Sequence, residues 1–314
     1  MPFAETPLRD EYAAAVERMA RRTLDALRGA GGTASLTEPD GLLASLLTDP
    51  EGSVPGAVLA AARILGPDLF APQLFNARSP LDPLNPLAPL APLAPLNPLD
   101  PSNPSNPSNP LKESTLVPLD DAAARLLAEA RRVFPPPAAD SWDGSPTGPP
   151  PPADDANLVI AWQDWAASAL LARTPYGGEA APPPAAVPRP GPRPGSPPGP
   201  RDWQAWSVRM AQLSVLALPG LDGPVHELAR THTLDLARGT ARSMLRRDLR
   251  TAARLARWLA WARADGRPLR LEVGPVLERI RLTGDGSART LLELAIADRL
   301  LNGPPEPVRA RAAR

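Results

Sequence analysis

Apolar side chains recur along this chain at the spacing of helices rather than of strands. Between residues 7 and 28, for example, Tyr12, Val16 and Met19 fall on one face of a helix. Patterns of this kind, with start or stop signals, predict helices at 7–28, 53–65, 119–134, 154–173, 201–218 and 287–301, and a shorter one near 39–47. The expected fold class is therefore all-α, an irregular helical body or bundle.

Two further stretches leave alternatives open. A long helical run is predicted from residue 224 to about residue 264, and a break near Gly239 would divide it. Residues 269–273 alternate between apolar and charged side chains, which fits a short strand. A short helix that starts at Pro275 fits the same sequence equally well.

Proline-rich stretches interrupt the predicted helices. The 314 residues include 45 prolines and 22 glycines, a composition close to that of extended or disordered segments. We therefore expect long linkers that are disordered. The predicted organisation is an N-terminal helical segment at 1–66, a proline-triplet linker at 67–117, a helix at 118–134, a proline-rich linker at 135–153, a helix at 154–173, a proline-rich linker at 174–200, a C-terminal helical domain at 201–303 and a tail at 304–314.

The first linker contains a low-complexity repeat. Between residues 80 and 110 a proline stands at every third position, followed seven times by leucine and then three times by serine. Proline fixes φ and lacks an amide proton, so this tract can form neither a helix nor a central strand. In polyproline II, with three residues per turn, the leucines would form one apolar stripe for an aromatic-lined groove. A semi-rigid spacer that arose by repeat expansion is the favoured interpretation.

Composition excludes several classes of function. The chain has no cysteine, which rules out disulfides, thiolate nucleophiles and cysteine-ligated zinc. Without such cross-links, and with a start that lacks the pattern of a secretory signal, the protein is expected to be cytoplasmic. The most apolar window, residues 158–172, is shorter than the ~20 residues needed to span a bilayer, so no transmembrane segment is predicted. Because the formal net charge is zero, attraction to phosphate groups would need a local basic patch.

The strongest candidate for such a patch is an arginine ridge on the predicted helical run at 224–264. Its members are Arg238, Arg242, Arg246, Arg250, Arg254 and Arg257, spaced by four residues and finally by three. They share one half of a helical wheel, which suits a phosphate backbone, an acidic partner helix or anionic lipid. A solvated face whose arginines pair with acids of neighbouring helices is the favoured interpretation. Asp248 projects toward the apolar half, which requires either an internal ion pair or a different rotation of the helix.

The tryptophans also form a pattern, because six of the seven come in pairs spaced by three residues. The pairs are Trp162 with Trp165, Trp203 with Trp206, and Trp258 with Trp261. This spacing puts two indoles on one helical face, which suits either a core or an anchor for a partner. Core packing is expected for the first two pairs. Trp261 projects among the arginines, where we expect it to stack on Arg257 or to mark a binding surface.

The histidines do not make a metal or catalytic site. The segment that begins at His226 starts like a zinc-protease helix, but Arg230 stands where that motif needs its second histidine. His232 and Asp235 share a helical face, yet two ligands do not hold a metal. His226 and His232 are therefore expected to be ordinary residues of a helix surface, and no metal or cofactor is predicted.

Residues 283–290 place two glycines directly before the last predicted helix. A phosphate can bind at such a position, but a helix start capped by Asp285 or Ser287 is the favoured interpretation. With no catalytic constellation, the expected function is that of a non-catalytic adaptor or structural protein that acts on an unidentified protein partner. The alternative is nucleic-acid binding through the arginine ridge with Trp261.

Overall fold

The computed structural model describes residues 5–29, 55–76, 121–135, 155–188 and 202–302. All of these residues belong to one compact unit. A second unit, Ala77–Pro118, contains the proline-triplet tract and lies outside the described residues. The short helix predicted at 39–47, most of the linker predicted at 135–153 and the tail at 304–314 also lie outside them.

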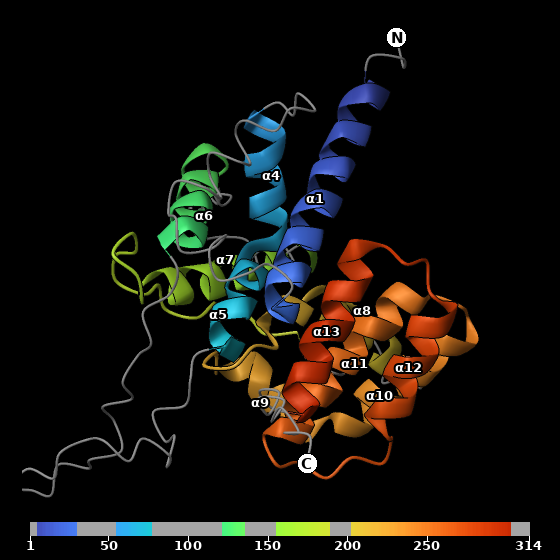
Figure 1. The fold of residues 1–314 in the computed structure, drawn as a ribbon. Coiled ribbons are helices and arrows are strands. Elements are labelled where there is room, and N and C mark those ends of the chain that lie inside the picture. Colours follow the sequence, from blue (N-terminus) through green and yellow to red (C-terminus); the bar gives the residue numbers. More distant parts are fainter. Residues whose placement is uncertain (1–4, 30–54, 77–120, 136–154, 189–201, 303–314) are drawn as a thin grey trace, which may run out of the picture. The chain divides into compact units, whose positions relative to one another are not determined.

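The described unit is built from helices joined by turns and extended segments (Figure 1). No strand occurs within the described ranges, which confirms the all-α prediction for this part of the chain. The helices predicted around 7–28, 53–65, 119–134, 154–173, 201–218 and 287–301 are present as α1, α4, α6, α7, α8 and α13. In chain order the elements are α1 Glu5–Arg28, α4 Pro55–Leu65, the 3₁₀ helix η1 Gly66–Phe70, α5 Ala71–Asn76, α6 Asp121–Val133, α7 Asp155–Leu171, α8 Asp202–Gln212, the 3₁₀ helix η2 Ser214–Leu216, α9 Pro224–Thr231, α10 Thr233–Leu245, α11 Leu249–Ala264, α12 Val273–Thr283 and α13 Ala288–Asn302.

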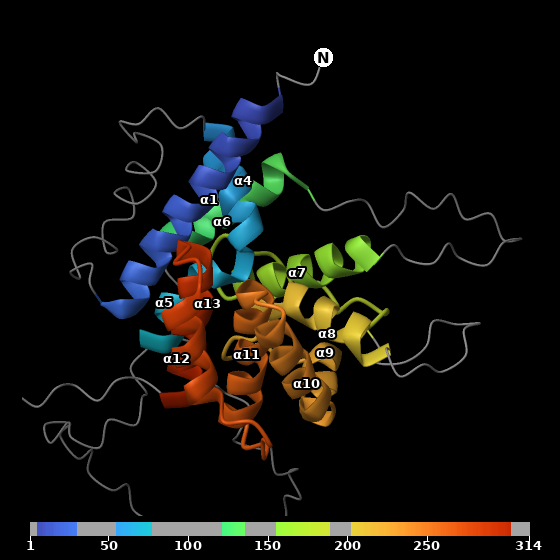
Figure 2. The same ribbon diagram turned by 90° about the vertical axis from the view of Figure 1, so that its right-hand side faces the viewer.

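Helix α11 forms the centre of the core. It packs against α8, α10, α12 and α13, and Figure 2 shows it between α13 and α10. Every residue from 255 to 262 is buried, so this stretch of helix is enclosed by protein on all sides. Small side chains at Ala252, Ala256 and Ala260 leave room for the neighbouring helices to pack against its backbone.

The core extends into residues that were predicted to be a linker. Residues 67–76 are helical, as η1 and α5, and Asp68, Leu69 and Phe70 are buried. Pro67 stands in the first turn of η1, where its missing amide proton costs no hydrogen bond. The glycine and proline at 66–67 therefore mark a change from α to 3₁₀ helix and not the beginning of the linker.

The helical run predicted at 224–264 is divided into α9, α10 and α11. The breaks fall at His232 and at residues 246–248, so the break considered near Gly239 is absent. Gly239 lies inside α10, where it faces α8. A Cβ atom at this position would lie 2.6 Å from the Cβ of Ser207 and 3.1 Å from a methyl group of Leu255. The glycine is required for close packing of three helices and not for a change of direction.

The second break has the geometry of a Schellman motif without its usual glycine. The amide of Asp248 donates to the carbonyl of Ser243, and the amide of Arg247 donates to that of Met244. Arg247 has a φ of 58°, in the left-handed region that favours glycine. The end of α11 has the same pattern with Gly266 at the equivalent position, at a φ of 80°. Because arginine, and not glycine, occupies the left-handed position at the first of these ends, no local pattern indicates that α10 stops there.

Of the two alternatives for this part of the chain, the short helix is present, and residues 269–272 form the loop before it. Helix α12 begins at Val273 with Pro275 in its first turn, and Leu269 and Leu271 pack against the core from the preceding loop. The strand alternative is therefore wrong.

One helical stretch among the described residues, Gly56–Phe75, is long and apolar enough to cross a membrane by length and composition. In this structure 67% of its apolar window is buried inside the unit. It also contains Asp68, a buried carboxylate that is ion-paired with Arg257. Such burial is typical of a core helix in a folded unit.

Candidate functional site

The structure divides the predicted arginine ridge between two helices and the turn that joins them. Arg238 and Arg242 lie on α10, Arg246 ends that helix, and Arg250, Arg254, Arg257 and Trp261 lie on α11. Because the helix is interrupted at residues 246–248, a spacing of four residues does not place these side chains on one face. The ridge is therefore not a single surface.

Asp248, which the helical wheel placed on the apolar side, is the N-cap of α11. Its carboxylate accepts a hydrogen bond from the amide of Thr251 at 3.1 Å, and the residue is exposed. Capping of this kind satisfies one of the free amides at a helix start. Neither an internal ion pair nor a rotated helix is needed to explain its position.

The three ridge arginines of α10 lie at or near the surface. Arg238 is exposed and lies 3.0 Å from a carboxylate oxygen of Asp235 on the same helix. The guanidinium carbon of Arg242 lies 6.0 Å from the ring centre of Trp203, a distance at which cation–π attraction acts. Arg246 is exposed and forms no ion pair with another described residue. Together with Arg250, whose side chain is 67% exposed, these three side chains are what remains of the predicted basic surface.

Arg257 is completely buried at the centre of the unit. Its Nη1 lies 2.9 Å from Oε2 of Glu293, and its Nη2 lies 2.8 Å from Oδ1 of Asp68. Its Nε donates to the carbonyl of Ala217 at 3.1 Å. Asp68 and Glu293 are themselves only 0% and 2% exposed, so the three side chains form a buried network. Arg257 ties η1 and α13 to α11 and is not accessible to a phosphate backbone.

Glu293 is held by more than one arginine. Its Oε1 lies 3.8 Å from Nε of Arg254 and 3.7 Å from Nη2 of Arg289, and it accepts a hydrogen bond from Ser214 at 3.0 Å. Burial alone would raise the pKa of Glu293, but the charges of Arg257, Arg289 and Arg254 outweigh it and lower that pKa. The carboxylate is therefore ionised at neutral pH and a weak base.

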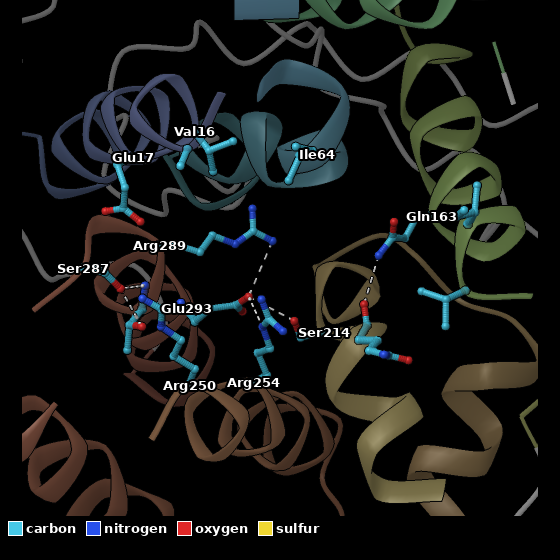
Figure 3. Close-up of a pocket in the computed structure, with 15 residues that line it drawn as sticks. Val16, Glu17, Ile64, Gln163, Ser214, Arg250, Arg254, Ser287, Arg289 and Glu293 are labelled. Carbon is cyan, nitrogen blue, oxygen red and sulfur yellow. Dashed lines mark hydrogen bonds and ion pairs between the residues drawn. The ribbon is translucent and has the colours of Figure 1, made fainter. Parts of the chain in front are cut away.

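A pocket of about 850 Å³ lies beside this network, between α1, α4, α7, α11 and α13 (Figure 3). In Figure 3 the guanidinium groups of Arg289 and Arg254 extend toward the middle of the pocket, with the carboxylate of Glu293 between them. Its volume is in the range of sites for small molecules. Its polar lining includes Glu17, Ser214, Arg250, Arg254, Ser287, Arg289, Thr290 and Glu293, and its apolar lining includes Val16, Ile64, Val159 and Ile160.

Several polar groups of the pocket are paired with neighbouring residues. Glu17 accepts a hydrogen bond from the first amide of α13 at 2.6 Å, and Arg250 lies 2.7 Å from Asp285. The hydroxyl of Ser214 donates to Glu293, and the lowered pKa of Glu293 makes this carboxylate a weak base. Within the described ranges, no group of three or more histidine, aspartate or glutamate side chains is placed to hold a metal ion.

The start of α13 is capped as predicted. The amide of Thr290 donates to the hydroxyl oxygen of Ser287 at 3.3 Å, and the amide of Ser287 donates to Asp285 at 3.1 Å. Burial opposes ionisation of Asp285, but hydrogen bonds from Arg250 and Ser287 lower its pKa to about 2. Asp285 thus links α11 to the loop before α13.

Trp261 and His226 lie in the core, which differs from the expectation for both. Trp261 is 6% exposed, and Arg230 instead of Arg257 lies over its ring, at 4.9 Å. His226 is 0% exposed, and its Nε2 donates to the carbonyl of Leu216 at 3.0 Å. Burial lowers the pKa of His226, so the ring is neutral at neutral pH. His226 is therefore a core residue and not a residue of a helix surface, as was predicted.

The tryptophans of α7 and α8 hold a proline-rich segment against the helices. Trp162, Trp165 and Trp206 are 0%, 9% and 1% exposed, which agrees with the core prediction, whereas Trp203 is only half-buried. The indole of Trp162 donates to the carbonyl of Ala186 at 2.8 Å, and that of Trp206 donates to the carbonyl of Pro188 at 2.7 Å. Val187, between these two residues, packs against the core. Residues 174–188, predicted to be part of a linker, therefore lie on the folded unit.

Sequence reasoning missed the two acids that organise the site. Glu293 interrupts an apolar stretch, between Leu292 and Leu294, and an acid in such a position indicates a buried ion pair. Asp68 gave no comparable signal, because it follows a glycine and a proline that suggested a linker. Their shared partner lies far away in the sequence, so only the fold brings them together.

Comparison with known proteins gives no further guidance. No family model, no curated protein and no solved structure matches this chain.

Proposed function

We propose that the protein is a non-catalytic adaptor that acts through protein–protein interaction. The helical unit is its folded body, and its proline-rich linkers, which we expect to be disordered, are the segments that partner domains bind. The observation that carries this proposal is the pair of indole hydrogen bonds to the carbonyls of Ala186 and Pro188.

These two hydrogen bonds use the chemistry by which aromatic grooves bind extended proline-rich strands. Such a strand has no internal backbone hydrogen bonds, so its carbonyls are free to accept. Trp162 and Trp206 supply donors to carbonyls two residues apart, while residues 181–183 of the same segment stay exposed. The contact supports a role for the other proline-rich stretches, including residues 80–110, as ligands for an aromatic-lined groove on a partner.

The chemistry of the pocket favours binding over catalysis. Glu293 is surrounded by arginines and has a lowered pKa, so it is poorly suited to accept a proton near neutral pH. Glu17 is engaged by the start of α13. Neither histidine of the chain is among the lining residues. These features support a protein whose sites hold other molecules without transforming them.

The alternative, nucleic-acid binding through the arginine ridge, has less support. Arg257 is buried, and Arg250 and Arg254 line the pocket. Of the ridge, Arg238, Arg242, Arg246 and Arg250 would be left to contact phosphates, and Arg250 is ion-paired with Asp285 although it is 67% exposed. Affinity for a phosphate backbone grows with the number of contacts, so a complex with four of them would be weak at physiological salt.

The proposal is tested by fluorescence anisotropy with the full-length chain. Labelled domains that bind proline-rich ligands in aromatic grooves (SH3, WW and EVH1 domains) are titrated with the protein. The test variant replaces the seven leucines of the tract at 80–110 by serine and keeps every proline. The matched control replaces the three serines that follow prolines in the same tract by alanine.

We expect at least one domain class to bind in the micromolar range, with binding lost in the leucine variant and kept in the serine control. The two variants and the native chain should show the same thermal unfolding. If no domain binds, or if the leucine variant binds as well as the native chain, the tract is a spacer and the proposed function fails.

A further inference from the structure

The pocket contains a guanidinium group with unused hydrogen-bonding capacity. The side chain of Arg289 is 16% exposed, and its Nη2 lies 3.4 Å from Asp68 and 3.7 Å from Glu293. Its Nη1 is buried and has no hydrogen-bond partner in the part of the chain that the structure describes. A buried donor without a partner is unfavourable, and such groups in native structures call for an explanation.

Arg254 is the second incompletely used arginine of the pocket. Its side chain is 35% exposed, and its only ion pair with a described residue is a 3.8 Å contact between Nε and Glu293. In Figure 3 it faces Arg289 across the Glu293 carboxylate. The two guanidinium groups together carry more N–H donors than Glu293 can accept, and such donors suit an oxyanion.

The arginine cluster beside the pocket has one more positive charge than negative charges. Three arginines, Arg254, Arg257 and Arg289, share two carboxylates, those of Asp68 and Glu293. The neighbouring Arg250 is balanced by an aspartate of its own, and the carboxylate of Glu17 faces the positive end of α13. The formal charges of all these groups sum to zero, so the excess of one positive charge is local to Arg254, Arg257 and Arg289.

The opposite wall of the pocket is aliphatic. Val16 of α1, Ile64 of α4, and Val159 and Ile160 of α7 line it. Ile64, a large apolar residue of this wall, is 51% exposed. An occupant with an apolar body would cover this surface, which would be favourable in proportion to the apolar area buried.

We propose that this pocket binds a small amphiphilic carboxylate, with its head group on Arg254 and Arg289 and its aliphatic body on Val16, Ile64 and Val159. A carboxylate supplies a single negative charge to offset the excess positive charge of the arginine cluster, and its two oxygens can accept hydrogen bonds from two guanidinium groups at once. A phosphate dianion would exceed that charge. This site is independent of the proline-rich segments and goes beyond the adaptor function.

The test is isothermal titration calorimetry of the full-length chain with decanoate, below the concentration at which decanoate forms micelles. Decanol tests the need for the charge, acetate the need for the aliphatic body, and decyl phosphate the preference for a single charge. We expect decanoate to bind at least tenfold more tightly than any of the other three. Equal binding of decanol, acetate or decyl phosphate, or no binding of decanoate, would overturn the proposal.

Variants locate the site. Arg254→Gln removes a partly exposed guanidinium group whose ion pair with Glu293 is 3.8 Å long. Ile64→Glu places a negative charge on the exposed aliphatic wall. Each variant should weaken decanoate binding at least tenfold. Arg246→Gln is the matched control, because Arg246 is exposed and lies outside the pocket, and it should bind as the native chain does. Unfolding curves identify any variant that fails to fold. Unchanged affinity in both folded pocket variants would place decanoate elsewhere and contradict the assignment.

Discussion

Replacement of Arg257 by leucine should be among the most damaging single changes in this chain. The side chain is 0% exposed and contacts Asp68 and Glu293, which are 0% and 2% exposed. Leucine would leave both carboxylates buried, with ion-pair contacts of 3.4–3.8 Å to Arg289 and Arg254 and a hydrogen bond from Ser214 to Glu293. Removal of one partner from a buried ion pair typically costs about 3–5 kcal/mol. That is a large part of the stability of a typical domain, roughly 5–15 kcal/mol.

Urea denaturation followed by tryptophan fluorescence measures this loss, since Trp162, Trp206 and Trp258 are buried in the same unit. The triple variant Arg257→Leu/Asp68→Asn/Glu293→Gln removes the stranded charges as well. We expect it to recover at least about 1 kcal/mol relative to the single variant, since groups in one network do not act independently. Arg246→Leu, at an exposed position, should change the unfolding free energy by less than about 0.5 kcal/mol.

Two results would refute this reasoning. One is a loss below about 1 kcal/mol in Arg257→Leu, the size typical of an arbitrary substitution and too small for a broken buried network. The other is a triple variant no more stable than the single one, because the cost would then come from lost packing and not from uncompensated charge.

Three further predictions concern the fold and are checked by urea unfolding curves. Gly239→Ala should destabilise the unit by about 1–3 kcal/mol, although alanine is the better helix former, because its Cβ would lie 2.6 Å from that of Ser207; a neutral or stabilising effect would contradict the packing. Arg247→Gly should stabilise it by about 1 kcal/mol through relief of the left-handed conformation, and an unchanged midpoint would argue against strain at the end of α10. Stability should fall as the pH drops below about 6.5, because the pKa of buried His226 is lowered in the folded state and the unfolded chain therefore binds the proton first. His226→Gln should weaken this pH dependence. An identical pH profile in that variant would exclude His226 as its cause.

The sequence was informative about local structure and much less so about long-range contacts. Apolar periodicity with its start and stop signals located six helices of the described unit, because those signals act over a few residues. The prediction failed at positions where a residue type serves another structural role than its usual one. Gly239 suggested a break but serves close packing, and Arg247 ends a helix at a position where glycine is usual.

The candidate site shows the same limit. A helical wheel places Arg238 and Arg257 on one face only if the helix is continuous, and the break at 246–248 removes that condition. The buried role of Arg257 depends on Asp68 and Glu293, which reach it through tertiary packing. Burial of an arginine is rare without such partners, so no local pattern could have indicated it.

We infer that Arg250, Arg254 and Arg257 serve the fold and the pocket, and that the surface arginines Arg238, Arg242 and Arg246 do not bind a phosphate backbone. The most direct test is fluorescence anisotropy of labelled DNA and RNA with the full-length chain across a salt titration. The variant Arg238→Gln/Arg242→Gln/Arg246→Gln, which alters only surface arginines, is measured in parallel. We predict no binding at moderate salt and no difference between the two proteins. Binding that weakens steeply with salt and is lost in the folded variant would contradict the claim and establish the nucleic-acid alternative.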